Sequence, residues 1–402
     1  MLPGRHKTWY FAIEGVNSFV TTFFFYYLYF FMQAHHEFDT KANLTLAAVT
    51  GLVYAVGSWL GGRFAQRAGY FTALKLGLGT MLCAIGFGWA VDSAAARVVS
   101  MAVAVAGMSL TWPALEALVS EGESISGIQH NIGIYNIVWA GTGALAYFVG
   151  GTLLEKLGMA SLFYVPIALV TLLIICAAVV DRRAVQTRTV KHAGSSPEAT
   201  CTAPVLTTPS GRAKVFLHMA WVANPFAYVA INTLVAAMPT VAARLALSPM
   251  HAGFYCSLWL FARVGAFGFL WLWPGWHYRF GWLFGSFTVL TGAFAVILVV
   301  PNLVAVIAAQ LLFGCASGLI YYSSLFYAMD LGETKGEHGG LHEAALGIGN
   351  CVGPAVGAAA LQFMPQYPNS GAIAVSLLLL AGLGAIRVQW HCGRSANGPH
   401  RK

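Results

Sequence analysis

Four ionisable residues that could bind a charged solute or a proton lie inside long apolar stretches of the chain: Glu14, Glu116, Arg263 and Glu343. If these stretches cross a membrane, each charge is costly there, so each residue is a candidate for function, with a structural ion pair as the alternative. A carboxyl group in such a stretch can carry a proton. Glu14 and Glu116 are therefore candidates for proton coupling, and a hydrogen bond that tethers two helices is the alternative.

Arg263 lies near the middle of the apolar stretch 250–273. An isolated charge at the centre of a bilayer costs between about 3 and 10 kcal/mol, depending on how much water reaches it. We therefore expect a partner, either an acidic side chain such as Glu343 or the negative group of a bound solute. The sequence leaves both possibilities open.

Polar and aromatic residues recur at steps of three or four in four apolar stretches, so the members of each set share one helix face. The sets are Glu14 with Asn17, Trp112 with Glu116, Asn224 with Tyr228 and Asn232, and Tyr321 with Ser324 and Tyr327. Such stripes suit hydrogen bonding and stacking against a polar solute. Hydrogen bonds between neighbouring helices are the alternative.

Histidines begin two further stretches, at His130 and at His342. Both could act in gating or relay protons, although a plain hydrogen-bonding role is the favoured alternative. No metal site is expected. The seven cysteines form no CxxC pair, and the group of His35, His36, Glu37 and Asp39 reads as a solvated loop.

Motifs for enzymatic chemistry are missing from the sequence. It contains no P-loop, no H-E-x-x-H and no G-x-S-x-G. We therefore expect neither an enzyme nor a cofactor, and any transport would draw on solute gradients. No catalytic residue is predicted.

The elements that must position these residues are membrane helices. Of the 402 residues, 58% are hydrophobic and only 9% are charged, and a spanning helix needs about 20 apolar residues. The sequence predicts an all-α membrane protein with twelve transmembrane helices, at 9–32, 44–62, 71–91, 98–120, 131–152, 159–180, 215–238, 250–273, 281–300, 303–326, 340–362 and 371–390.

Lysine and arginine placement predicts the orientation, since short loops rich in these residues stay cytoplasmic. The basic segment 181–214 separates six spans from six, and it is predicted to be a cytoplasmic linker. Both termini are then predicted to be cytoplasmic. The predicted location is the plasma (inner) membrane. The net charge of +8 fits contact with anionic lipid, and no nucleic-acid partner is expected.

The two halves resemble each other at an offset of 212 residues: Arg67 and Gly69 match Arg279 and Gly281, and His130 matches His342. Internal repeats of this kind build many transporter folds, with the solute site at the repeat interface. We therefore expect two pseudo-symmetric six-helix bundles, 1–180 and 215–402.

The segment from Gly62 to Gly69 resembles the G-x-x-x-D-R-x-G signature of the major facilitator superfamily, with Gln66 in place of the aspartate. The resemblance implies that Arg67 and Gly69, with Arg279 in the matching loop, take part in gating. The signature's carboxylate belongs to a charge network in that family, so Arg67 needs another partner here, such as Glu121.

A second resemblance to the family is the helix motif Gly349-x-x-x-Gly353-Pro354-x-x-Gly357 in the eleventh stretch. Drug antiporters of the superfamily carry this motif in the fifth span, where this chain has Ala146 and Tyr147. Small residues also let helices pack closely, which is the structural alternative.

Together these observations predict a secondary transporter, coupled to protons and acting as a monomer by alternating access. Its predicted substrate is a small polar organic solute, with an anionic solute as one option. The alternatives are a drug or metabolite exporter and a sensor of transporter-like fold that binds its solute without moving it. The sequence names neither the solute nor the direction of transport.

Overall fold

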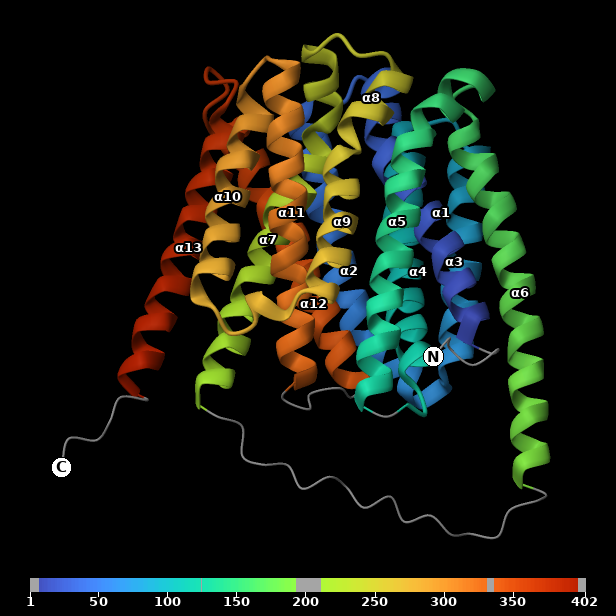
Figure 1. The fold of residues 1–402 in the computed structure, drawn as a ribbon. Helices are drawn as coiled ribbons and strands as arrows, with labels where there is room; N and C mark the ends of the chain where they lie inside the picture. Colours follow the sequence, from blue (N-terminus) through green and yellow to red (C-terminus); the bar gives the residue numbers. More distant parts are fainter. Residues whose placement is uncertain (1–6, 124, 193–210, 331–335, 397–402) are drawn as a thin grey trace, which may run out of the picture.

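The computed structural model describes residues 7–123, 125–192, 211–330 and 336–396 (Figure 1). These residues form helices and contain no strand. The helices are α1 (Lys7–His36), α2 (Thr40–Ala68), α3 (Tyr70–Ala90), α4 (Ala94–Ser120), α5 (Ile125–Leu157), α6 (Ser161–His192), α7 (Gly211–Arg244), α8 (Pro249–Cys256), α9 (Leu258–Leu272), the 3-10 turn η1 (Pro274–Trp276), α10 (Phe280–Val299), α11 (Leu303–Asp330), α12 (Gly336–Phe363) and α13 (Ser370–Ala396).

Eleven spans in the described part of the chain are long and apolar enough to cross a membrane, and α8 with α9 makes one of them. The twelfth is α1, whose 30 residues exceed the roughly 20 that a bilayer requires. Polar residues such as Glu14, Asn17 and Ser18 interrupt its apolar sequence. The predicted all-α fold with twelve membrane helices is confirmed.

Short polar caps begin three helices at one face of the molecule. The Asp39 side chain accepts from the Ala42 amide at the start of α2 (2.7 Å), and Ser93 accepts from Ala96 at the start of α4 (3.1 Å). Ser248 accepts from the amide of His251 in α8 (3.3 Å). A side-chain oxygen at this position satisfies an amide that has no partner within the helix, so these residues fix where the turns end.

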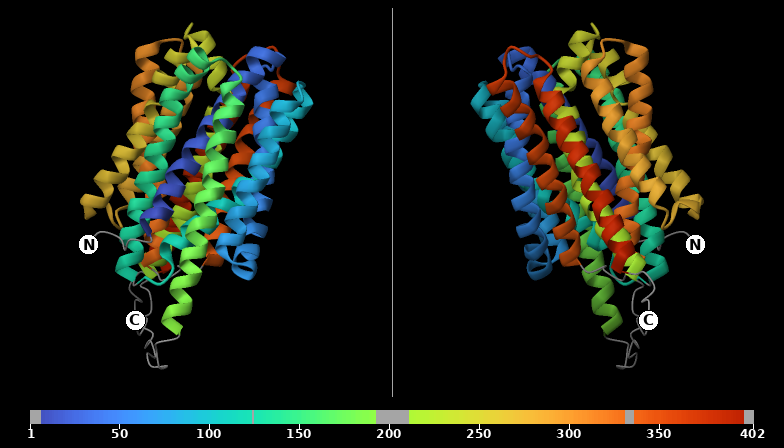
Figure 2. Two further views of the ribbon diagram at one scale, coloured as in Figure 1. Left: turned by 90° about the vertical axis from the view of Figure 1, so that its right-hand side faces the viewer. Right: turned by 90° about the vertical axis from the view of Figure 1, so that its left-hand side faces the viewer.

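The first six helices form one bundle and α7 to α13 form the other, side by side (Figure 1). The start of α1 and the ends of α6 and α13 lie at the same face, which we call the terminal face. α6 projects beyond its neighbours there (Figure 2). It continues to His192, so residues 181–192 of the predicted linker are helical, and residues 193–210 lie outside the described residues.

Among the helix pairs that join the halves, α2 with α12 and α5 with α8 approach each other most closely. Glycines allow both approaches, because a Cβ on Gly51 would collide with the backbone of Asn350, and one on Gly347 would collide with Ala55. At the face opposite the termini, a Cβ on Gly151 would collide with the carbonyl of Pro249. The approach of α2 to α12 brings polar groups of the two halves together inside the molecule.

Candidate solute-binding cavity

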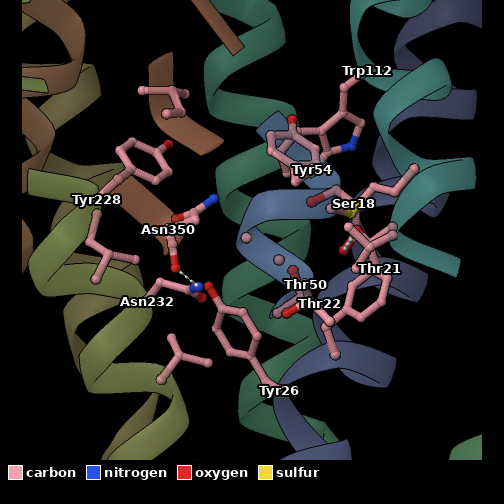
Figure 3. Close-up of a pocket in the computed structure, with 18 of the residues that line it drawn as sticks. Ser18, Thr21, Thr22, Tyr26, Thr50, Tyr54, Trp112, Tyr228, Asn232 and Asn350 are labelled. Carbon is pink, nitrogen blue, oxygen red and sulfur yellow. Dashed lines mark hydrogen bonds between the residues drawn. The ribbon is translucent and has the colours of Figure 1, made fainter. Parts of the chain in front are cut away.

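A cavity of about 140 Å³ lies between the two halves and is lined by α1, α2, α4 and α5 on one side and by α7, α9 and α12 on the other. Figure 3 shows Tyr228 and Asn232 on one wall and Tyr54, Trp112 and Ser18 on the facing wall. The wall is mainly apolar with a few polar groups, as is usual for small-molecule sites. An engineered cavity of about 150 Å³ holds benzene, so the space suits a small solute.

The sequence predicted part of this lining. The predicted residues that line the cavity are Trp112, Tyr228, Asn232, Arg263 and Glu343. Lining residues that the sequence analysis missed include Ser18, Thr21, Tyr26, Tyr54, Trp139 and Asn350. The predicted residues that are not part of the lining are Glu14, Asn17, Glu116, Asn224, Tyr321, Ser324 and Tyr327.

Arg263 of α9 is 2% exposed and sits among aromatic rings. Its guanidinium carbon lies 4.9 Å from the ring centres of both Trp139 and Tyr321, and Nη2 donates to the Tyr228 hydroxyl at 3.1 Å. Aromatic faces attract a cation. No ion pair within 4.0 Å includes Arg263 among the described residues, so the expected direct pair with Glu343 is absent there. A buried arginine without an acidic partner can bind an anionic group.

Glu343 of α12 lies on the same cavity and is also buried. Its Oε2 accepts a short hydrogen bond from the hydroxyl of Tyr54 in α2. This bond joins the two halves of the molecule inside the membrane region. Tyr54 was not predicted as a site residue because nothing in its neighbouring sequence marks it among the 16 tyrosines of the chain.

Amide and indole groups complete the walls. Asn232 donates from its side chain to the carbonyl oxygen of Asn350 at 2.8 Å (Figure 3). The ring of Trp112 lies 6.3 Å from Tyr54 and 6.1 Å from Trp139, and its Nε1 has no hydrogen-bond partner among the described residues. The cavity therefore offers amide groups on one side and aromatic surface on the other.

Several predicted residues bind neighbouring helices instead of facing the cavity. The Asn224 amide of α7 donates to the Ser324 hydroxyl of α11 at 3.0 Å. The Tyr327 hydroxyl accepts from the amide of Tyr278 at 3.2 Å. Tyr321 packs against Arg263 from behind the lining. For these positions the structure agrees with the alternative of contacts between helices.

Glu14 and Glu116 belong to a buried region of the first half beside the cavity. Glu14 is 0% exposed, and neither of its carboxyl oxygens has a hydrogen bond of good geometry among the described residues, although Tyr135 and Asn17 lie beside it. Asn17 itself donates to the Thr111 hydroxyl at 3.4 Å. Glu116 acts on Glu14 as a like charge. The region thus concentrates carboxyl groups with no basic partner among the described ion pairs.

The predicted gating residues lie toward the terminal face. Gly69 joins α2 to α3 with φ 94° and ψ 145°, a conformation that is nearly confined to glycine. Arg67 is exposed, and the described ion pairs do not include it. Arg279 precedes α10, where its amide donates to the Trp276 carbonyl at 3.3 Å. The loop signature therefore fixes a turn, and the described ion pairs provide no latch at Arg67.

The two histidines contact aromatic rings. His130 of α5 lies 5.8 Å from the ring of Trp271 in α9, across the interface between the halves, and His342 lies 6.0 Å from Tyr321. His342 Nε2 has no hydrogen-bond partner among the described residues. Of these two histidines, His130 is the one that contacts a ring of the opposite half among the described residues.

The glycine motif of α12 has a packing role. A Cβ on Gly349 would collide with the Pro225 carbonyl, and one on Gly353 would collide with the Val229 carbonyl, both in α7. Small residues allow such close helix contact. The observed packing agrees with the alternative explanation of this motif, in which its small residues allow close contact between helices.

Twelve membrane helices in two bundles, with a cavity between them, define the architecture of a membrane transporter. A sequence model described as the Major Facilitator Superfamily matches residues 18–354. The chain belongs to this superfamily. No curated protein matches it.

Solved structures show the same fold. The nucleoside transporter NupG is similar with a TM-score of 0.65 and 13% identity, covering 97% of this chain and 99% of that one. The peptide transporter POT is similar with a TM-score of 0.68 and 16% identity, covering 96% of this chain and 95% of that one. At this identity the likeness establishes the fold alone.

Proposed function

We propose that the chain is a proton-coupled secondary transporter that carries a small polar organic solute with an anionic group through this cavity. One observation supports this proposal above all others: Arg263 is buried on the cavity wall without an acidic partner among the described residues. A charge in that position needs compensation. The negative group of a solute supplies it during each transport cycle.

Alternating access fits the way the halves meet. At the face opposite the termini, the Thr40 and Thr240 hydroxyls lie 2.7 Å apart and the Lys41 ammonium donates to Gln362 at 3.1 Å. We infer that this conformation is closed at that face. Transport then requires the bundles 1–180 and 215–402 to rock about the cavity while the segment 181–214 connects them.

Protons are the proposed coupling ion, with Glu14 and Glu116 as the proton carriers. Both lie in spans, and Glu14 is fully buried without a basic partner among the described ion pairs. A carboxyl in such surroundings gains by holding a proton. Its release when the bundles rearrange would link the proton gradient to solute movement.

We propose that the terminal face is cytoplasmic and that the protein resides in the plasma (inner) membrane as a monomer. Single cysteines at His36 and Arg183, which lie at opposite faces, test this orientation in a chain whose native cysteines are replaced. An impermeant thiol reagent added from outside should label position 36 and spare position 183. The reverse pattern would contradict the orientation.

The functional test is uptake into proteoliposomes that contain the full chain. A broad library of small organic solutes is screened with and without a pH gradient. We expect saturable uptake of polar anionic solutes that the gradient stimulates. Specific binding of a solute without any uptake would instead show that the protein is a sensor.

A further inference from the structure

The cavity is lined by one basic and one acidic side chain that do not pair with each other. Arg263 of α9 and Glu343 of α12 both line it, yet no ion pair within 4.0 Å joins them. Each instead meets one tyrosine hydroxyl, because Arg263 donates to Tyr228 and Glu343 accepts from Tyr54. The cavity therefore has a basic group on α9 and an acidic group on α12, both contributed by the second half and not paired with each other.

The surroundings of each charge keep the two apart. Ring faces of Trp139 and Tyr321, each 4.9 Å away, hold the guanidinium of Arg263. The hydroxyl of Tyr54, from the opposite half, holds the carboxyl of Glu343. Closing the gap between the charges would break these contacts, so a bound molecule is better placed to bridge them.

Each of the two tyrosine hydroxyls keeps a hydrogen-bonding capacity that suits the same kind of ligand group as the side chain that it contacts. The Tyr228 oxygen accepts from Arg263, so its own O–H remains available to donate to an anionic group. The Tyr54 hydroxyl donates its proton to Glu343, so its lone pairs remain available to accept from a cationic group. The Tyr228 hydroxyl therefore favours an anionic group, as Arg263 does, and the Tyr54 hydroxyl favours a cationic group, as Glu343 does.

We propose that the solute is a small zwitterion, with its carboxylate on Arg263 and Tyr228 and its ammonium group on Glu343 and Tyr54. This inference rests on the transport function proposed above and names the class of substrate. A carboxylate suits the planar donors of arginine, and an ammonium group offers three donors to carboxyl and hydroxyl oxygens. The volume of about 140 Å³ suits a solute of the size of a small amino acid.

Solutes with one charge fit the cavity less well. A simple anion offers Glu343 no donor beyond the hydroxyl of Tyr54, and a simple cation leaves Arg263 without an acidic partner. Removing one partner of a buried charge pair is strongly unfavourable. The arrangement therefore selects for solutes that carry both charges.

Binding to the full chain in nanodiscs tests this inference. The probes are three mixtures built on the same small α- and β-amino acids: the free zwitterions, their N-acetyl derivatives as anions, and their amides as cations. Dissociation constants come from titration calorimetry. We expect the zwitterions to bind at least about tenfold more tightly than either singly charged set, since a site built for a polar group rejects analogues that lack it.

Variants test which residues bind the ammonium group of the zwitterion. Glu343→Gln should abolish the preference for zwitterions over N-acetyl anions, and Tyr54→Phe should reduce it, which keeps the test open if the first variant fails to fold. Glu155→Gln, the same change at the face opposite the termini, is the control and should keep the preference.

Equal binding of zwitterions and N-acetyl anions to the unmodified chain would overturn the inference and leave the proposed transport of anionic solutes in place. An unchanged preference in a folded Glu343→Gln protein would overturn it as well. If no mixture binds, the zwitterion assignment is wrong, and the uptake screen decides the broader proposal separately.

Discussion

The hydroxyl of Tyr54 donates a hydrogen bond to the carboxyl of Glu343, and this bond connects α2 of the first bundle with α12 of the second. Both residues are buried. The bond exists only while α2 and α12 keep their present approach. It therefore links the state of the cavity to the relative position of the halves.

Loss of this hydroxyl should destabilise the present conformation. Tyr54→Phe leaves a buried carboxyl oxygen without its donor, at a cost of about 1–3 kcal/mol, and should lower the melting temperature in nanodiscs. Tyr26→Phe is the matched control, because Tyr26 lines the same cavity and its hydroxyl makes no hydrogen bond among those described. Equal melting temperatures for both variants would show that the Tyr54 bond contributes nothing to stability.

The turn between α2 and α3 should depend on glycine. Gly69→Ala places a side chain at φ 94°, which costs about 1–3 kcal/mol, and should lower the melting temperature. Gly281, its partner in the sequence repeat, is not among the described glycines with positive φ and has no atom within 4 Å of an added Cβ. Gly281→Ala should therefore be tolerated, and similar losses in both variants would contradict the backbone argument.

Proton coupling should depend on the carboxyl groups beside the cavity. The combined change of Glu14→Gln and Glu116→Gln removes both proposed proton carriers, so a pH gradient should no longer stimulate uptake into proteoliposomes. Transport that still responds fully to the gradient would show that these residues are structural.

Glu123 provides the control for that experiment. It lies between α4 and α5, 2.7 Å from the Lys7 ammonium, whose hydrogen bond lowers the pKa of the Glu123 carboxyl. The stabilising pair is therefore present at neutral pH and is lost only as the pH falls through that lowered pKa. Glu123→Gln should leave the response to a pH gradient unchanged.

Arg263 could be predicted from the sequence because a charge inside an apolar stretch is visible without a structure. Its surroundings could not, since Trp139 and Tyr321 come from α5 and α11, and periodicity within one helix says nothing about which other helices face it. For the same reason the contact of Tyr327 could not be predicted. Tyr327 shares a predicted helix face with Ser324, but its hydroxyl accepts from the backbone amide of Tyr278.

The twelve spans were predictable because hydropathy and length determine them. Helix ends were harder to predict, since α6 continues to His192 through residues that are polar and basic. Such residues are good helix formers once a helix has left the membrane. Composition alone therefore marks where the apolar part of a span ends, and not where the helix ends.

A solute-binding role of Arg263 and a purely structural role predict different effects of its replacement. Arg263→Lys keeps the charge but loses the planar donor geometry, so it should weaken solute binding. Arg263→Gln should abolish binding without lowering the melting temperature, because removing a costly buried charge offsets the lost hydrogen bond to Tyr228 and the lost ring contacts. Arg244→Gln is the contrasting control. Arg244 donates to the carbonyls of Leu298 and Ile297, and its replacement should destabilise the protein.

The most direct test measures solute affinity and melting temperature together in Arg263→Gln and in the unmodified chain, with the best solute from the uptake screen. An anion-binding role of Arg263 predicts a loss of affinity of at least about tenfold, or about 1.4 kcal/mol, at an unchanged or higher melting temperature. Normal affinity in a well-folded Arg263→Gln protein would contradict it.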